Sequence, residues 1–244
     1  MIFNLTQPVV DSAPKFTYTG TYEYIDDGGG NWRIKFLTSG VFKPLKNMTV
    51  DAFLVGGGAA GKGVSWSAYG GSGGFTTTVK EIALTKNTEY NVVIGAGGIG
   101  NGTAGGASTG FTGIAEGANS TPGKGGSGGA YMKYSGGVTQ NAGSDGANGS
   151  DYSPGQGSTT REFGESTGDL YAGGGAAAYL SGGTSGIVLA KAGEGGGGGI
   201  SGLVPLSGTP NTGGGGCGKE GSSATQGAGG SGIVIIRKHK EAAA

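Results

Sequence analysis

Glycine accounts for 62 of the 244 residues, and its uneven distribution constrains this chain more than any other feature. Five glycines precede residue 56, and the other 57 lie between Gly56 and Gly232. A glycine inside a helix costs roughly 1 kcal/mol relative to alanine, because its backbone loses more freedom on folding. The sequence therefore predicts an all-β protein with very little helix.

The glycine-poor N-terminal part has the pattern of β-strands. Aromatic residues occupy alternate positions from Phe16 to Tyr24, a turn is predicted at 26–31, and residues 32–36 alternate between apolar and charged. Further strands are predicted at 50–55, 75–79 and 89–94. A period of two is typical of antiparallel sheets with one face toward solvent. These segments predict an antiparallel β-sandwich.

Near its C-terminal end the chain has a continuously apolar run, Ile-Val-Ile-Ile at 233–236. Such a run predicts a central strand that is buried on both faces. We expect this strand to close the N-terminal sandwich. The predicted organisation is a sandwich of residues 1–94 plus 231–238, a glycine-rich lobe of residues 95–230, and a tail of residues 239–244.

The glycine-rich part has several interpretations. Collagen is excluded, because it needs glycine at every third position and abundant proline, and the chain has 7 prolines. A flexible linker, irregular loops on a β core and disorder stay open. The favoured interpretation is a bundle of polyglycine II helices, whose backbones can approach and bond because no Cβ atom separates them. Glycine clusters such as 56–58, 95–98, 125–129 and 195–199 suit short antiparallel rods.

Several matches to catalytic or nucleotide-binding motifs arise from the glycine content. Residues 95–100 match G-x-G-x-x-G and residues 56–62 resemble a phosphate-binding loop, but neither is followed by the helix that would meet a phosphate. Residues 70–74 and 125–129 match G-x-S-x-G. The chain has one histidine, His239, which we expect to be a solvated tail residue rather than a catalytic base. We therefore expect no catalytic residue, no cofactor and no enzyme activity.

Acidic residues are scattered over the predicted loops. A carboxylate pair for glycoside hydrolysis and a loose calcium site at Asp145 or Asp151 stay open. The favoured interpretation is that these carboxylates are solvated turn residues, so no metal ligand is assigned. The set comprises Asp26, Asp27, Asp145, Asp151, Glu162, Glu165 and Asp169.

Charge and cysteine content narrow the class of protein further. The formal net charge is zero and 13% of the residues are charged, so no nucleic-acid partner is expected. The single cysteine, Cys217, cannot form an intrachain disulfide and is expected to be buried. The N-terminus lacks the basic and apolar regions of a signal peptide, and no apolar run reaches 18 residues. We expect no signal peptide and no membrane insertion.

Four stretches in order resemble the glycine-rich domain family of phage and prophage tail-fibre and receptor-binding proteins. The first is W-R-I-K-F at 32–36 with S-G-V-F at 39–42, and the second is the strand at 50–55 that runs into Gly56. The third is residues 84–98, where Lys86 and Asn87 replace the family's Pro-Gly, and the fourth is residues 229–237. The resemblance extends from about residue 32 to residue 237.

The resemblance implies a non-enzymatic module on the virion surface, such as a tail-fibre tip or a receptor-binding adhesin. Its partners would be a host cell-surface glycan or protein and other virion proteins. The alternative is a structural virion component, such as a head-fibre, decoration or fibre-capping protein, and a depolymerase is a third class. The N-terminal segment with Phe3 and Leu5 could dock on a partner or form a homotrimer.

Aromatic residues on predicted loops are the candidates for binding. Aromatic rings combined with adaptable polar groups suit both sugar and protein surfaces. The alternative for each residue is packing against the glycine-rich rods. The candidates are Trp66, Tyr69, Phe111, Tyr131, Tyr134, Tyr152, Phe163, Tyr171 and Tyr179.

Overall fold

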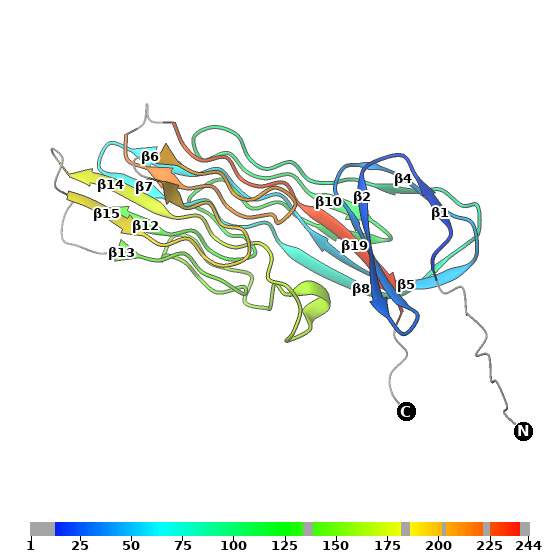
Figure 1. The fold of residues 1–244 in the computed structure, drawn as a ribbon. Helices are drawn as coiled ribbons and strands as arrows, with labels where there is room; N and C mark the ends of the chain where they lie inside the picture. Colours follow the sequence, from blue (N-terminus) through cyan, green and yellow to red (C-terminus); the bar gives the residue numbers. More distant parts are fainter. Residues whose placement is uncertain (1–12, 134–138, 182–185, 202–203, 222–224, 240–244) are drawn as a thin grey trace, which may run out of the picture.

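The computed structural model describes residues 13–133, 139–181, 186–201, 204–221 and 225–239. These residues form β-strands and one short 3₁₀ turn, η1 (Glu162–Gly164), which confirms the predicted all-β class. The described residues contain no helix with the length and apolar character needed to span a membrane. The chain forms an elongated body with sheets toward both ends and extended segments between them (Figure 1).

The strands follow the chain in this order: β1 (Phe16–Tyr18), β2 (Tyr22–Gly28), β3 (Asn31–Phe36), β4 (Gly40–Pro44), β5 (Met48–Val55), β6 (Lys62–Val64), β7 (Ser67–Tyr69), β8 (Thr76–Leu84), β9 (Tyr90–Val92), β10 (Ser108–Gly110), β11 (Gly113–Ala115), β12 (Tyr131–Lys133), β13 (Thr139–Gln140), β14 (Ala177–Ser181), β15 (Gly186–Ala190), β16 (Ile200–Ser201), β17 (Val204–Pro205), β18 (Gly218–Lys219) and β19 (Ile233–Lys238).

A five-stranded sheet and a three-stranded sheet form what we call the proximal end. The larger sheet has the order β2-β3-β19-β5-β8 and the smaller one β1-β4-β9. β19 is central and pairs antiparallel with β3 and β5, as its apolar run predicted. Val234 and Ile236 point into one core cluster while Ile233 and Ile235 point into another, which explains why every position of the run is apolar.

The two proximal sheets share one aromatic core. Phe36 from the larger sheet and Phe42 from the smaller sheet are fully buried, with ring centroids 5.6 Å apart in an edge-on arrangement. Phe111 completes this core from the two-residue turn between β10 and β11. Both residues of that turn, Phe111 and Thr112, have positive φ, as the commonest hairpin turns require. The shared core is the arrangement that the predicted sandwich calls for.

Two smaller sheets form what we call the distal end. One has the order β13-β12-β7-β6 and the other β15-β14-β18. They share a core cluster of small and medium-sized side chains, in which Ala68 and Met132 meet Ala177 and Tyr179. Period-two patterns did not predict these strands, because each is only two to five residues long.

Between the two ends, glycine-rich segments are joined by backbone hydrogen bonds. The six N–H groups of residues 56–61 donate to carbonyls of three other segments, 72–75, 103–106 and 227–230, at 2.9 Å each. Positions three residues apart donate to the same neighbouring segment. A helix with three residues per turn would produce this repeat. The polyglycine II conformation itself stays a prediction, but the described segments form a bonded array rather than a flexible linker.

The division into a sandwich and a glycine-rich lobe stays a prediction, and the sheets draw on both parts. β6 and β7 belong to the predicted sandwich residues but lie in the distal sheet. Phe111 belongs to the predicted lobe but lies in the proximal core. The chain passes between the two ends several times (Figure 1).

The backbones of neighbouring segments lie so close together that many glycines leave no room for a Cβ atom. Substitution of Gly58 tests whether stability depends on this close approach. A Cβ atom on Gly58 would lie well inside contact distance of the Gly214 carbonyl oxygen, whereas one on Gly199 would meet nothing. We expect Gly58→Ala to lower the free energy of unfolding by about 1–3 kcal/mol or more, because the two segments must separate. Gly199→Ala should change it by less than about 0.5 kcal/mol. Equal midpoints for both variants in chemical denaturation would contradict the bonded array.

Candidate binding sites

Three tyrosines from three segments form what we call the tyrosine cluster, on the outer face of the distal four-stranded sheet. Tyr69 of β7 and Tyr131 of β12 are cross-strand partners, with stacked rings 4.8 Å apart. Tyr152 packs edge-on against both, with centroid distances of 6.1 and 5.3 Å. The neighbouring pair, Ala68 and Met132, points to the opposite face and into the distal core.

A pair of polar side chains fixes the turn that holds Tyr152. The Asp151 backbone N–H donates to Gln140 Oε1 at 3.2 Å, and Gln140 Nε2 donates to Asp151 Oδ2 at 3.5 Å. Gln140 is the cross-strand partner of Tyr131. The turn is therefore tied to the strand beside it, and the Tyr152 ring, which is 55% exposed, is positioned before any partner arrives.

The phenols of the cluster supply polar groups at the edge of an apolar surface. Burial raises the pKa of Tyr69, and the neighbouring Tyr131 raises it further. The Tyr69 hydroxyl therefore stays neutral well above physiological pH, where it can both donate and accept hydrogen bonds. The cluster combines ring surface with uncharged hydroxyl groups, which is a combination that suits recognition.

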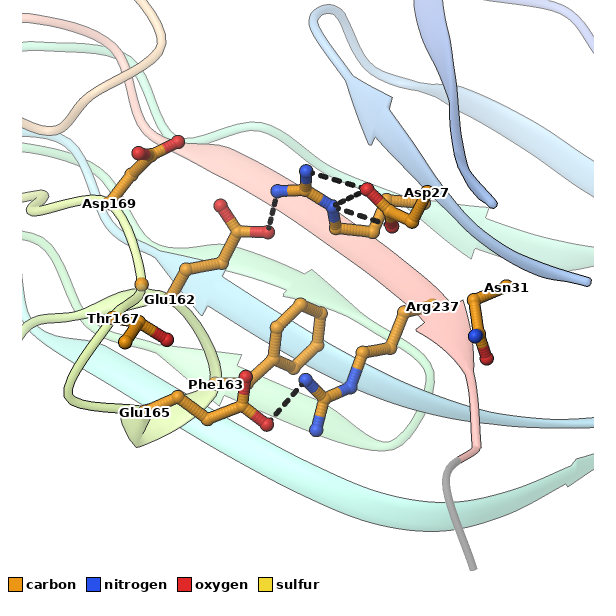
Figure 2. Close-up of a pocket in the computed structure, with 10 residues that line it drawn as sticks. Asp27, Asn31, Glu162, Phe163, Glu165, Thr167, Asp169 and Arg237 are labelled. Carbon is orange, nitrogen blue, oxygen red and sulfur yellow. Dashed lines mark hydrogen bonds and ion pairs between the residues drawn. The ribbon is translucent and has the colours of Figure 1, made fainter. Parts of the chain in front are cut away.

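A polar pocket of about 370 Å³ lies at the proximal end, where the loop around η1 covers β3 and the end of β19 (Figure 2). Its lining is dominated by charged groups from the β2–β3 turn, from β19 and from this loop. The lining residues are Asp27, Asn31, Arg33, Glu162, Phe163, Glu165, Thr167, Gly168, Asp169 and Arg237.

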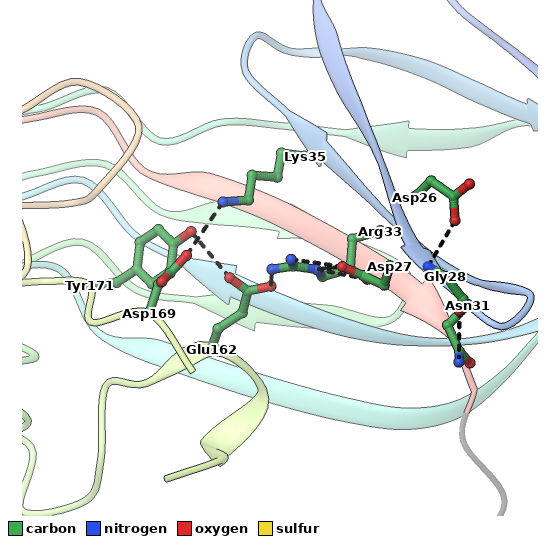
Figure 3. Close-up of polar contacts among 9 residues, drawn as sticks. All are labelled: Asp26, Asp27, Gly28, Asn31, Arg33, Lys35, Glu162, Asp169 and Tyr171. Atoms are coloured by element: carbon green, nitrogen blue, oxygen red, sulfur yellow. Dashed lines mark hydrogen bonds and ion pairs between the residues drawn. The ribbon is translucent and has the colours of Figure 1, made fainter. Parts of the chain in front are cut away.

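Arg33 connects the β2–β3 hairpin to the η1 loop (Figure 3). Its Nη2 lies 2.9 Å from Asp27 Oδ1, and its Nη1 lies 2.8 Å from Glu162 Oε1. Hydrogen bonding to Asp27 and Glu162 raises the pKa of Arg33 against the opposing effect of burial. Glu162 is buried and also accepts a 3.4 Å hydrogen bond from the Tyr171 hydroxyl. Burial and the negative charge of Glu162 raise the pKa of Tyr171.

Arg237 makes a second connection, between β19 and the same loop. Its Nη1 lies 2.7 Å from Glu165 Oε1, and its Nε lies 3.2 Å from Asp51 Oδ2. The guanidinium also stacks 4.1 Å above the ring of Phe163, which has a positive φ of 55°. Asp51 is 1% exposed, and its other oxygen lies 2.6 Å from His239 Nδ1.

The hydrogen bonds of Asp51 determine its protonation. Burial alone would raise the pKa of this carboxyl, but hydrogen bonds from His239, the Glu81 backbone N–H and Arg237 lower it below its ordinary value of 3.8. Asp51 therefore stays ionised, and its negative charge is shared between two basic side chains. Both guanidinium groups in the pocket are committed to carboxylates, so the geometry suits holding the η1 loop against the sheet.

Within the part of the chain that the structure describes, no three His, Cys, Asp or Glu side chains come close enough to hold a metal ion. Asp145, one of the two calcium candidates, accepts hydrogen bonds from the Thr159 hydroxyl and the Thr160 N–H and pairs with Arg161 at 3.4 Å. Asp151, the other, is bonded to Gln140.

The structure places the nine predicted binding aromatics in different environments. Tyr69, Tyr131 and Tyr152 come together, and Trp66 is 65% exposed at the tip of the β6–β7 hairpin. Four others are buried in core clusters and contribute to packing rather than to an exposed surface: Phe111, Phe163, Tyr171 and Tyr179. Tyr134 lies outside the described residues.

The ion pairs of the pocket were missed by sequence reasoning. Glu162 was expected to be a solvated turn residue and His239 a solvated tail residue, and both expectations were wrong, because Glu162 is buried and the His239 side chain is mostly covered. Asp27 and Glu165 stay partly exposed, as expected of solvated turn residues, but each also pairs with an arginine. Arg33 and Glu162 are 129 residues apart, and Arg237 and Asp51 are 186 apart. No local spacing signals such pairs, because they form only when the loop and the C-terminal strand reach the same sheet.

Comparison with known proteins adds one finding. A family model described as a glycine-rich domain matches residues 37–239. The matched region includes β4 to β19, the tyrosine cluster and most of the polar pocket. No curated protein matches the chain.

Asp51 generates a pH-dependent prediction. Its pKa is lowered in the folded state, so its contribution to stability is fully present above pH 3.8 and is lost as the pH falls through the folded-state pKa. We expect Asp51→Asn to cost about 3–5 kcal/mol at pH 7, because Arg237 loses a buried partner. Urea unfolding should show that the difference in the free energy of unfolding between wild type and Asp51→Asn becomes smaller below pH 3.8.

The exposed Asp26 provides a matched control, and Asp26→Asn should change the free energy of unfolding at pH 7 by about 0.5 kcal/mol or less. A loss for Asp51→Asn that is the same at pH 7 and pH 3, or no loss at either pH, would refute the role assigned to this carboxylate.

Proposed function

The chain belongs to the glycine-rich domain family. We propose, from the resemblance of its four sequence stretches, that it is a phage virion-surface protein: a tail-fibre tip or receptor-binding adhesin-type module that recognises a host cell-surface structure. The observation that supports this proposal most directly is the position of the tyrosine cluster. It presents the exposed ring of Tyr152 on a preorganised face at the distal end, far from the first and last described strands (Figure 1).

The two ends of the molecule would have different tasks. β1 and β19, the first and last described strands, both lie at the proximal end. Attachment to another virion protein through either terminus would leave the distal end pointing outward. The exposed rings of Tyr22 and Tyr24 on the edge strand β2 offer further proximal surface for such a partner or for a homotrimer.

The bonded glycine segments support this arrangement energetically. A binding site on a flexible mount loses conformational entropy when its partner binds, whereas a site on a rigid mount loses little. The segment of residues 56–61, for example, is bonded to three neighbouring segments along its length. Such bonding would hold the distal sheets at a fixed distance from the proximal ones. The bonded glycine segments would therefore hold the proposed binding surface at a defined distance from the particle.

Blocking one end at a time tests the proposal. Ser65 at the distal hairpin tip and Glu23 on β2 are exposed, and each can be changed to cysteine and coupled to a polymer-linked maleimide. Cys217 is buried, and burial raises its pKa to about 12, so the natural thiol should not react. We expect the Ser65→Cys conjugate to lose most of its binding to susceptible bacteria in flow cytometry, and the Glu23→Cys conjugate to retain it.

The wild-type chain treated with the same reagent controls for labelling elsewhere. Loss of binding from the proximal conjugate alone would reverse the proposed orientation. If the unlabelled protein binds no strain in a panel that the particle infects, the receptor role is refuted and the alternative, a structural virion component, is favoured.

A further inference from the structure

We propose that the tyrosine cluster binds a neutral sugar ring of the host surface, with Tyr152 as the main contact. The inference rests on the proposed function, because it requires that the distal end meets the host. It goes further by assigning the site and the chemical class of the ligand.

The chemistry of the cluster complements that of a pyranose. One face of such a ring carries C–H groups and is apolar, while its rim carries hydroxyl groups that both donate and accept hydrogen bonds. Tyr152 offers an exposed ring, and the phenols of Tyr69, Tyr131 and Tyr152 lie within one group of rings whose centroids are 4.8–6.1 Å apart. Apolar and hydrogen-bonding surfaces therefore alternate over a distance similar to the width of a sugar ring.

The size of the cluster favours a sugar over a protein partner. Tyr131 is only 9% exposed and Tyr69 is half-buried, so most of the open ring surface belongs to Tyr152. A stable protein interface covers about 800 Å² on each partner and has a desolvated apolar centre. One exposed ring bordered by the polar Gln140 and Asp151 is the size of one or two sugar units instead.

The carboxylate beside the contact ring favours a neutral sugar over an acidic one. The carboxylate of Asp151 is adjacent to Tyr152 and is bonded to Gln140, an uncharged group. An acidic sugar placed on Tyr152 would therefore face a like charge. Gln140, Tyr131, Tyr69 and Lys62 are successive cross-strand partners on the four strands. Lys62 is therefore at the opposite end of this row from Gln140, and its aliphatic stem lies beside Gly102.

Rigidity of the contact ring completes the argument. The Asp151–Gln140 hydrogen bonds connect the Tyr152 turn to β13, and β13 pairs with β12, which contains Tyr131. Sugars bind weakly at single sites because each contact competes with water, so a surface that is already ordered has the advantage of losing little further entropy on binding.

The experiment measures binding of the full chain to immobilised neutral oligosaccharides built from glucose, galactose, mannose or N-acetylglucosamine, beside acidic ones that contain glucuronic or sialic acid. We expect at least one neutral sugar to bind. Tyr152→Ala should weaken that binding about tenfold or more, because the main ring contact is lost. Tyr152→Phe keeps the ring and should lose about two- to fivefold. Ile114→Ala, which removes a 57% exposed apolar side chain on β11 beside the proximal sheet, is the control and should bind like wild type.

A parallel measurement on cells separates this inference from the proposed function. Binding to bacteria that is competed by the neutral sugar and abolished by periodate oxidation of the cells supports the inference. Binding that survives periodate but is lost after protease treatment overturns it in favour of a protein receptor, while the adhesin function stands. Absence of all cell binding counts against the proposed function itself. Binding of acidic sugars alone, or equal binding by wild type and a folded Tyr152→Ala variant, would overturn the inference.

Discussion

The whole molecule depends on direct hydrogen bonding between backbones that have no side chains between them. In an ordinary protein a Cβ atom keeps neighbouring extended segments apart except in the plane of a sheet. Here the N–H groups of residues 56–61 reach three different segments, and the carbonyls of Gly57, Gly58 and Ala59 accept from still others. Every buried backbone group can be paired in this way without a helix or a regular sheet. The glycine content is thus a requirement of the architecture and not a sign of disorder.

This solution has a consequence for where side chains can be placed. A conventional core needs large apolar groups, and the bonded segments leave no room for them. The large residues are therefore concentrated at the two ends, with Phe36, Phe42 and Phe111 in the proximal core and Met132 and Tyr179 in the distal one. One core lies at each end of the bonded segments. β19 follows the glycine-rich part and forms the central strand of the larger proximal sheet. Hydrophobic burial and backbone bonding stabilise different parts of the same chain.

How much of this could be predicted depends on the range of the interaction. Alternation located β2, β3 and β5, and the continuous apolar run located β19 with its two buried faces. These signals are local, because the order of apolar and polar side chains along a strand indicates which of its faces are buried. The distal sheets gave no such signal, since strands such as β12 and β13 contain two or three residues. The direction of an aromatic ring was equally hidden: Phe111 and Tyr152 both follow turn-like sequence, yet one fills the core and the other faces solvent. The Arg33–Glu162 pair could not be foreseen, because its partners meet only after the chain has passed to the distal end and back.

The same architecture restricts where the proposed recognition can occur. Along the bonded segments a new side chain would collide with a neighbouring carbonyl at most glycine positions, so few of these glycines can be replaced without a loss of stability. At the proximal end the charged groups Arg33, Arg237, Asp51 and Glu162 are committed to one another and hold the η1 loop in place. The distal turns and strands face neither restriction: Tyr69, Tyr131 and Tyr152 lie on a sheet face whose opposite side is already packed. A substitution at an exposed position of this face, such as Tyr152, changes the surface without entering the distal core, which is the property that the proposed recognition surface requires.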